Sequence, residues 1–80
     1  MAEIGRLWGR GVLVGAGTES NVFYDIRVNE ERIIASMIFE PPTRELDPGP
    51  EKLTLRLEDG RQLAGFYEGD GTFKVTGGFF

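Results

Sequence analysis

The chain has 80 residues, a net charge of −4, and neither cysteine nor histidine. One small domain is therefore expected, without disulfides and without the usual ligands of structural zinc, so packing, closure of a sheet or oligomerisation must stabilise it. No apolar run has the length of a secretory signal or a membrane span, which favours a cytoplasmic protein that does not enter a membrane.

The excess of acid lies in residues 40–70, which hold eight acidic and four basic side chains. Proteins that bind nucleic acid normally present a basic surface, because neutralising phosphates supplies much of their affinity. The charge balance therefore argues against nucleic acid as a partner.

A first strand is predicted over residues 5–16, although the segment contains four glycines: Gly5, Gly9, Gly11 and Gly15. Glycine inside a strand marks a bend or bulge, or a place where a ligand or another backbone comes close. We interpret this segment as a strongly bent strand, with a smooth face for a ligand or partner as the alternative.

Two further strands are predicted, each preceded by a polar turn at residues 17–21 or 29–32. In the first of these strands, residues 22–28, apolar residues that face the core alternate with residues on a more solvent-exposed face, which still carries Phe23. The next, residues 33–39, is apolar on both faces and includes Ile34 and Ile38. It predicts either a strand covered on both sides or one that lines a contact between copies of the chain.

Residues 40–51 form a proline-rich loop or crossover. Its prolines exclude regular structure beyond one helical turn at residues 43–46. A stiff crossover between two halves of a sheet is the preferred interpretation, and an acidic docking loop is the alternative.

The clearest local pattern is the alternation of Leu53, Leu55 and Leu57 with polar residues, followed by Asp59-Gly60. It predicts a hairpin with a two-residue type I′ turn, which needs positive φ at both central residues. Another turn at residues 68–71 and a last strand at residues 72–76 follow.

These segments amount to six strands without an amphipathic helix, so the fold class is all-β. The whole chain, residues 1–80, is expected to form one antiparallel domain of three strands, the proline-rich crossover, and three more strands. A meander barrel or roll is preferred because closure removes exposed sheet edges, and a two-sheet β-sandwich is the alternative.

The residue types give catalysis little support. Histidine and cysteine, the commonest general base and a common nucleophile, are absent. Acidic residues remain at the predicted turns, where they are usually present for backbone geometry. We therefore predict no enzyme activity, no catalytic residue, no metal site and no cofactor.

Nine aromatic residues are more than the faces of such a small barrel can bury. Adjacent rings at Phe66 and Tyr67 cannot both point inward, and two rings follow flexible glycines at the end of the chain. Exposed apolar side chains in a patch usually mark an interaction site. The candidate interaction residues are Trp8, Phe23, Ile34, Ile38, Phe66, Tyr67, Phe79 and Phe80.

The sequence therefore favours a non-enzymatic interaction module that self-associates, most simply as a homodimer, and that can also bind another protein. The first alternative is a small-ligand site at the barrel mouth near Trp8 and Tyr67. The second is a single-stranded nucleic-acid binder, in which the exposed rings stack on bases and Arg6, Arg10 and Arg27 supply positive charge.

Overall fold

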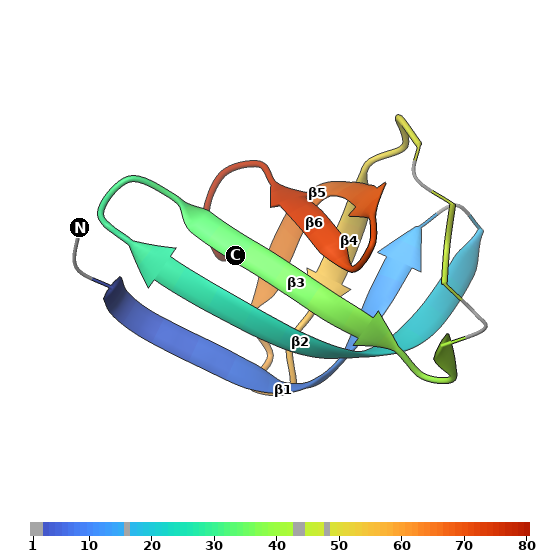
Figure 1. Cartoon of the computed structure of the whole chain (residues 1–80), viewed down its shortest axis with the longest axis horizontal. Coiled ribbons are helices and arrows are strands. Elements are labelled where there is room, and N and C mark those ends of the chain that lie inside the picture. Colours follow the sequence, from blue (N-terminus) through green and yellow to red (C-terminus); the bar gives the residue numbers. More distant parts are fainter. Residues whose placement is uncertain (1–2, 16, 43–44, 48) are drawn as a thin grey trace.

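The computed structural model describes residues 3–15, 17–42, 45–47 and 49–80, with side chains from Gly5 onward. It consists of two three-stranded meanders joined by the proline-rich crossover. The first meander contains β1 (Glu3–Gly15), β2 (Thr18–Asn29) and β3 (Ile33–Phe39). The second contains β4 (Leu53–Arg56), β5 (Gln62–Gly69) and β6 (Thr72–Val75). Figure 1 shows β2 and β3 side by side across the view, with the second meander on the other side of β3.

The strands close into one antiparallel barrel in the order β1-β2-β3-β6-β5-β4. Closure depends on two short contacts between the meanders. β1 pairs with β4 over Val12–Val14, and β3 pairs with β6 at Ala35 and Ser36. The predicted all-β meander barrel is confirmed, and the alternative of a two-sheet sandwich is wrong.

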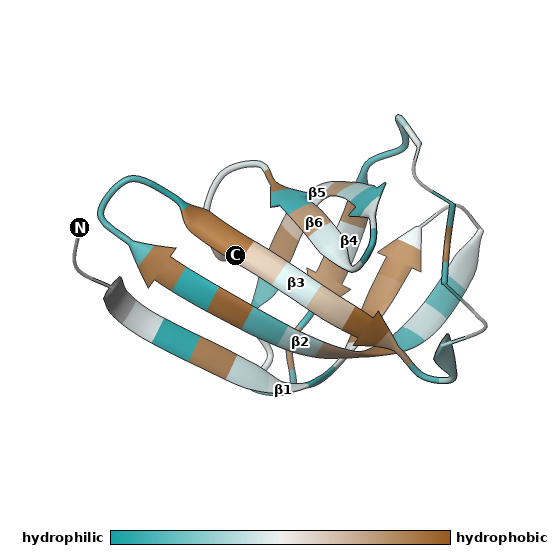
Figure 2. Ribbon diagram, in the orientation of Figure 1, coloured by the Kyte–Doolittle hydropathy of each residue, from teal (hydrophilic) through white to brown (hydrophobic). Residues whose placement is uncertain are grey.

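The core is built from the inward side chains of all six strands, as their alternation predicts. Figure 2 shows apolar and polar bands taking turns along β1 and β2. Leu13, Ile26, Leu55 and Leu63 are fully buried. The remaining buried core residues are Val22, Tyr24, Ala35, Met37, Phe39, Leu53, Leu57, Tyr67 and Phe73.

β3 is covered on one side only by the described part of the chain. Ala35, Met37 and Phe39 point into the core, whereas Ile34 and Ile38 are exposed. The expectation of a strand covered on both sides is therefore wrong for the single chain, because β3 lies in the barrel wall.

Gly11 lets β1 pass close to its neighbours. A Cβ at Gly11 would overlap the carbonyl oxygen of Arg56 in β4 and would lie 3.0 Å from the Tyr24 ring. Gly9 likewise faces the Glu58 carboxylate and the Tyr24 hydroxyl. These glycines therefore make room for the protein's own side chains and backbone, and not for a ligand.

The Asp59-Gly60 hairpin forms, but its predicted turn type is wrong. The loop has three residues, because the Leu57 N–H donates to the Arg61 carbonyl at 2.8 Å and the Gly60 N–H donates to the Leu57 carbonyl at 3.1 Å. Only Gly60 has positive φ, which is the pattern of a type I turn followed by a left-handed glycine. Asp59 instead accepts hydrogen bonds from Arg61, which hold the pKa of this carboxyl below its ordinary value.

The type I′ turn lies instead between β5 and β6. Gly69 pairs with Thr72, and the two residues between them, Asp70 and Gly71, have φ of 52° and 77°. Two consecutive positive φ values match the right-handed twist of a tight hairpin. The same dipeptide, Asp-Gly, thus forms a three-residue loop at one site and a two-residue turn at the other.

The proline-rich segment connects β3 to β4, which are not neighbours in the barrel. Leu46 packs against the core and anchors the loop. Within the expected helical turn at residues 43–46, residues 43 and 44 lie outside the described residues, and Glu45 and Leu46 have no regular structure. No helix in the described ranges is long and apolar enough to cross a bilayer.

Candidate interaction surface

The outer surface of the first meander brings basic, aromatic and aliphatic side chains together. In the register of β1 with β2 and of β2 with β3, Arg10, Phe23 and Ile38 form one cross-strand row. The neighbouring rows are Trp8–Asp25–Ser36 and Arg6–Arg27–Ile34. We call these nine residues the β1–β3 face.

The apolar members of this face are open to solvent. Trp8 is 70% exposed and Ile38 is 64% exposed, and Phe23 and Ile34 are also exposed. Phe23 and Ile38 are directly opposite each other on paired strands, so their side chains form a continuous apolar area. An exposed tryptophan beside further exposed apolar side chains makes the β1–β3 face a candidate interaction surface.

Arg6 is held in place beside Trp8. Its guanidinium donates two hydrogen bonds to the Asp25 carboxylate, at 3.0 and 2.8 Å, in the bidentate geometry typical of strong ion pairs. The carbon of the guanidinium also lies 5.6 Å from the centre of the Trp8 ring. The hydrogen bonds from Arg6 hold the pKa of Asp25 below its ordinary value.

Arg10 makes a similar contact with the ring of Phe23. Its guanidinium carbon lies 5.0 Å from the centre of the Phe23 ring, and one of its nitrogens lies 3.9 Å from a Glu40 carboxylate oxygen. Each exposed ring of β1 and β2 therefore has an arginine against it. Such cation–π contacts restrict the conformations of the long arginine side chains.

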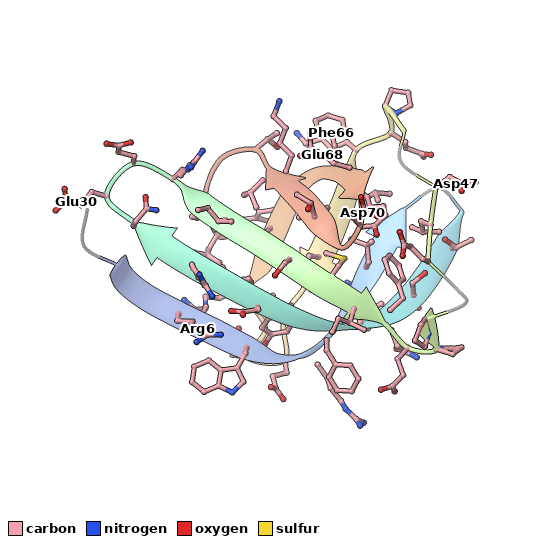
Figure 3. The ribbon with its side chains drawn as sticks, in the orientation of Figure 1. Arg6, Glu30, Asp47, Phe66, Glu68 and Asp70 are labelled. Carbon is pink, nitrogen blue, oxygen red and sulfur yellow. The ribbon has the colours of Figure 1, made fainter. Side chains whose placement is uncertain are left out.

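The structure brings together four of the eight predicted interaction residues: Trp8, Phe23, Ile34 and Ile38. Phe66 is half-buried on β5, and Figure 3 shows it with Glu68 on the side of the barrel opposite Arg6. Phe66 is therefore not part of the β1–β3 face.

Tyr67 is a correction. It is only 2% exposed and points into the barrel, because the alternation of β5 sends Phe66 outward and Tyr67 inward. Its ring packs edge-on against Phe39 with centroids 5.2 Å apart. Its hydroxyl accepts a hydrogen bond from the Gly71 N–H at 2.8 Å. Burial, together with a hydrogen bond to Glu45, raises the pKa of Tyr67 to about 12.

The two terminal phenylalanines lie on the second meander. Phe80 is exposed, but its backbone exchanges two hydrogen bonds with Gln62, at 2.8 and 2.9 Å, so the tail is fixed to β5. Phe79 is half-buried, packs against the core, and lies under the guanidinium of Arg61. These rings form a separate, smaller apolar area.

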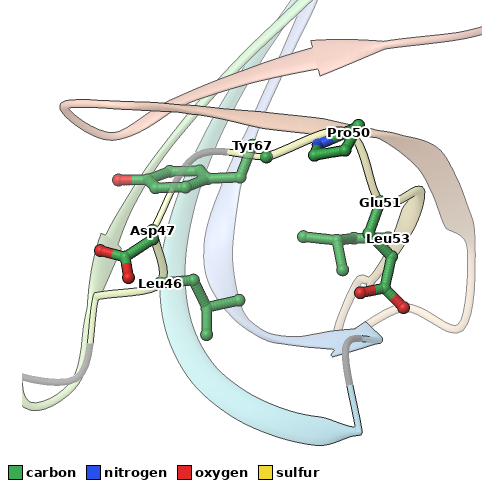
Figure 4. A pocket seen from close by; sticks show the side chains of 7 residues that line it. Leu46, Asp47, Pro50, Glu51, Leu53 and Tyr67 are labelled. Carbon is green, nitrogen blue, oxygen red and sulfur yellow. The ribbon is translucent and has the colours of Figure 1, made fainter.

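A shallow pocket of about 260 Å³ opens at one mouth of the barrel, under the proline-rich loop (Figure 4). Leu46, Pro50, Leu53 and Tyr67 line its apolar wall, and Asp47 and Glu51 also line it. Trp8 is not among the described residues that line this pocket, so the pocket is not the expected ligand site shared by Trp8 and Tyr67.

Sequence reasoning found the exposed rings but missed Asp25, which fixes Arg6. No local pattern marks Asp25, since its role depends on the pairing of Trp8 with Asp25 across β1 and β2. Arg6, Trp8 and Arg10 occupy every second position of β1, so they lie on one face of this strand.

No protein family, no curated protein and no solved structure was found to match this chain.

Proposed function

We propose that this protein is a non-enzymatic interaction module that self-associates through the surface formed by β1, β2 and β3. The observation that carries the proposal is the 70% exposure of Trp8 on a face that also exposes Phe23, Ile34 and Ile38. The proposal includes a cytoplasmic location. It also assigns the apolar part of the face around Ile38 to binding a further protein partner.

The chemistry of the face supports binding to protein. Tryptophan and arginine are the residues most enriched among interface hot spots, and aromatic residues and arginine are enriched in interface cores. Arg6 is already held by Asp25, and Arg10 lies against Phe23, so little side-chain entropy remains to be lost on association.

Sedimentation of the wild type and of two matched variants tests the proposal. Trp8→Ser removes an exposed ring from the β1–β3 face, and Phe80→Ser removes a ring of similar exposure, 63%, from outside it. We expect a wild-type dimer, a dissociation constant at least about tenfold higher for Trp8→Ser, and no change for Phe80→Ser. Circular dichroism establishes that both variants are folded. A wild-type monomer at high micromolar concentration would contradict the proposal.

Binding of single-stranded nucleic acid is the second candidate, and one observation favours it. Arg6, Arg10 and Arg27 lie on the same face as Trp8 and Phe23, which is the combination of charge and stacking rings that such proteins use. Asp25 and Glu40 offset two of these charges, and the net charge is −4. This candidate requires that short oligonucleotides quench Trp8 fluorescence at low salt and are released at high salt.

A further inference from the structure

β1 has an open edge that runs from Gly5 to Arg10. β1 contains thirteen residues, whereas its second neighbour, β4, contains four and reaches only Val12–Val14. Among the described residues, no strand pairs with Gly5–Arg10 on the side away from β2. An exposed strand edge is a template for pairing with another strand.

The backbone groups that face this edge follow from the alternation of an antiparallel ladder. The Glu40 N–H donates to the Asn21 carbonyl at 2.9 Å, so Asn21 and every second residue after it in β2 face β3. The residues between them, such as Ile26, face β1 and pair with residues such as Leu7. It follows that the N–H and C=O groups of Arg6, Trp8 and Arg10 point away from β2, toward the open edge.

This edge has few of the features that usually block strand addition. Proteins protect edges with proline, with charged side chains, lysine above all, or with a bulge that twists the strand away. Residues 5–10, Gly-Arg-Leu-Trp-Gly-Arg, contain neither proline nor lysine, and their two charged side chains, Arg6 and Arg10, are ion-paired with Asp25 and Glu40. The irregularity in the β1–β2 ladder lies before them, between Glu3 and Gly5.

We propose that two copies of this chain pair along β1, antiparallel, around a two-fold axis at Leu7. This inference rests on the proposed self-association and specifies its geometry. The two β1 strands would join the two β1–β3 sheets into one sheet that runs across both molecules, which is the simplest isologous form of strand addition.

The sequence Gly5-Arg-Leu-Trp-Gly9 is complementary to itself in this register. Arg6 of one copy lies opposite Trp8 of the other on the outer surface, and Leu7 lies opposite Leu7 on the inner surface. Gly5 lies opposite Gly9, so no side chain crowds the space that Glu58 already occupies beside Gly9. The contact between Arg6 and Trp8 repeats across the axis the cation–π pair that each copy already forms.

The neighbouring register is less favourable. It would place Trp8 opposite Trp8 and Arg6 opposite Arg10 of the other copy. Like charges directly opposite each other destabilise a strand pair. Charge therefore selects the register centred on Leu7.

A pair of variants at one position isolates the backbone contact. Arg6→Ala and Arg6→Pro both lose the ion pair with Asp25, but only Arg6→Pro loses the N–H that points to the open edge. Proline is tolerated on an edge strand where its nitrogen points away from the neighbouring strand, so β1–β2 pairing should survive. We expect the dissociation constant of Arg6→Pro to exceed that of Arg6→Ala by about tenfold, because the two-fold axis repeats the lost bond.

Amide exchange of the wild type gives a readout that does not depend on any variant folding. The Arg6 and Trp8 amides should exchange more slowly as protein concentration rises, while the Leu7 amide, which bonds to β2, stays equally slow. Exchange at Arg6 and Trp8 that is independent of concentration in a dimeric sample would overturn the inference.

A third variant separates this inference from the proposed function. Ile38 lies on β3, two strands and about 10 Å from the edge of β1. Ile38→Ser should therefore leave the dimer intact. A dimer that Ile38→Ser dissociates and that Arg6→Pro does not affect would mean face-to-face association, so edge pairing would be wrong and self-association would stand. A wild-type monomer would contradict both.

Discussion

Tyr67 is a titratable residue in an environment very different from that of a free side chain. It is buried at the end of β5, where its hydroxyl joins the proline-rich loop, through Glu45, to the β5–β6 turn, through Gly71. Since the phenolate would be buried beside carboxylates, the protonated form is favoured in the folded state. Tyr67 therefore links the stability of the fold to pH.

The first prediction concerns this linkage. The pKa of Tyr67 is raised from 10.0 to about 12 in the folded protein, so the unfolded chain releases this proton first as pH rises. The stabilising contribution of Tyr67 is complete below pH 10 and is lost as pH rises toward 12. Urea unfolding at several pH values should show a steeper loss of free energy of unfolding for the wild type than for Tyr67→Phe. Parallel curves would contradict this role.

The second prediction concerns Asp70 in the type I′ turn. A left-handed conformation costs an ordinary residue about 1–2 kcal/mol, whereas aspartate and asparagine tolerate it. Asp70→Val should therefore lower the free energy of unfolding by about that amount, and Asp70→Asn should leave it nearly unchanged. Urea unfolding followed by circular dichroism measures both, and equal stabilities would mean that the turn does not impose φ of 52° on this residue.

At the scale of elements, alternation predicts which side of a strand faces the core. It is enough for β2, where Val22, Tyr24 and Ile26 are buried, and for Leu53 and Leu55 of β4. It fails where both faces are apolar, as at Phe66 and Tyr67, because sequence alone does not say which of the two rings faces the core. The turn type could not be predicted from the local sequence either. The β4–β5 and β5–β6 hairpins both contain Asp-Gly, and the register of the flanking strands determines the length of each loop.

The third prediction concerns the glycines of β1. Gly11 has no room for a methyl group beside Arg56 and Tyr24, whereas a Cβ added at Gly5 would meet no described atom within 4 Å. Gly11→Ala should cost about 1–3 kcal/mol of stability through overpacking, and Gly5→Ala should be close to neutral. The difference in urea midpoint between the two variants, measured at low protein concentration, gives the cost. If Gly11→Ala were as stable as Gly5→Ala, close approach would not explain the glycine.

At the scale of the whole molecule, the short strands of the second meander leave the long first meander partly unmatched. β4 and β6 have four residues each, while β1 and β2 have thirteen and twelve. The barrel therefore closes through the C-terminal end of β1, which pairs with β4, and through the middle of β3, which pairs with β6. An edge of β1 and the exposed face around Trp8 remain accessible to a second chain. The sequence indicated the surplus of apolar residues, but the open edge depends on strand pairing, which no local pattern contains.

The fourth prediction concerns the native mass of the protein. The single chain has a mass of 8.9 kDa. Sedimentation equilibrium of the wild type, carried to high micromolar concentration at moderate salt, should give the mass of two chains and a reversible return to one chain on dilution. A mass of 8.9 kDa at every concentration would contradict self-association through β1, β2 and β3.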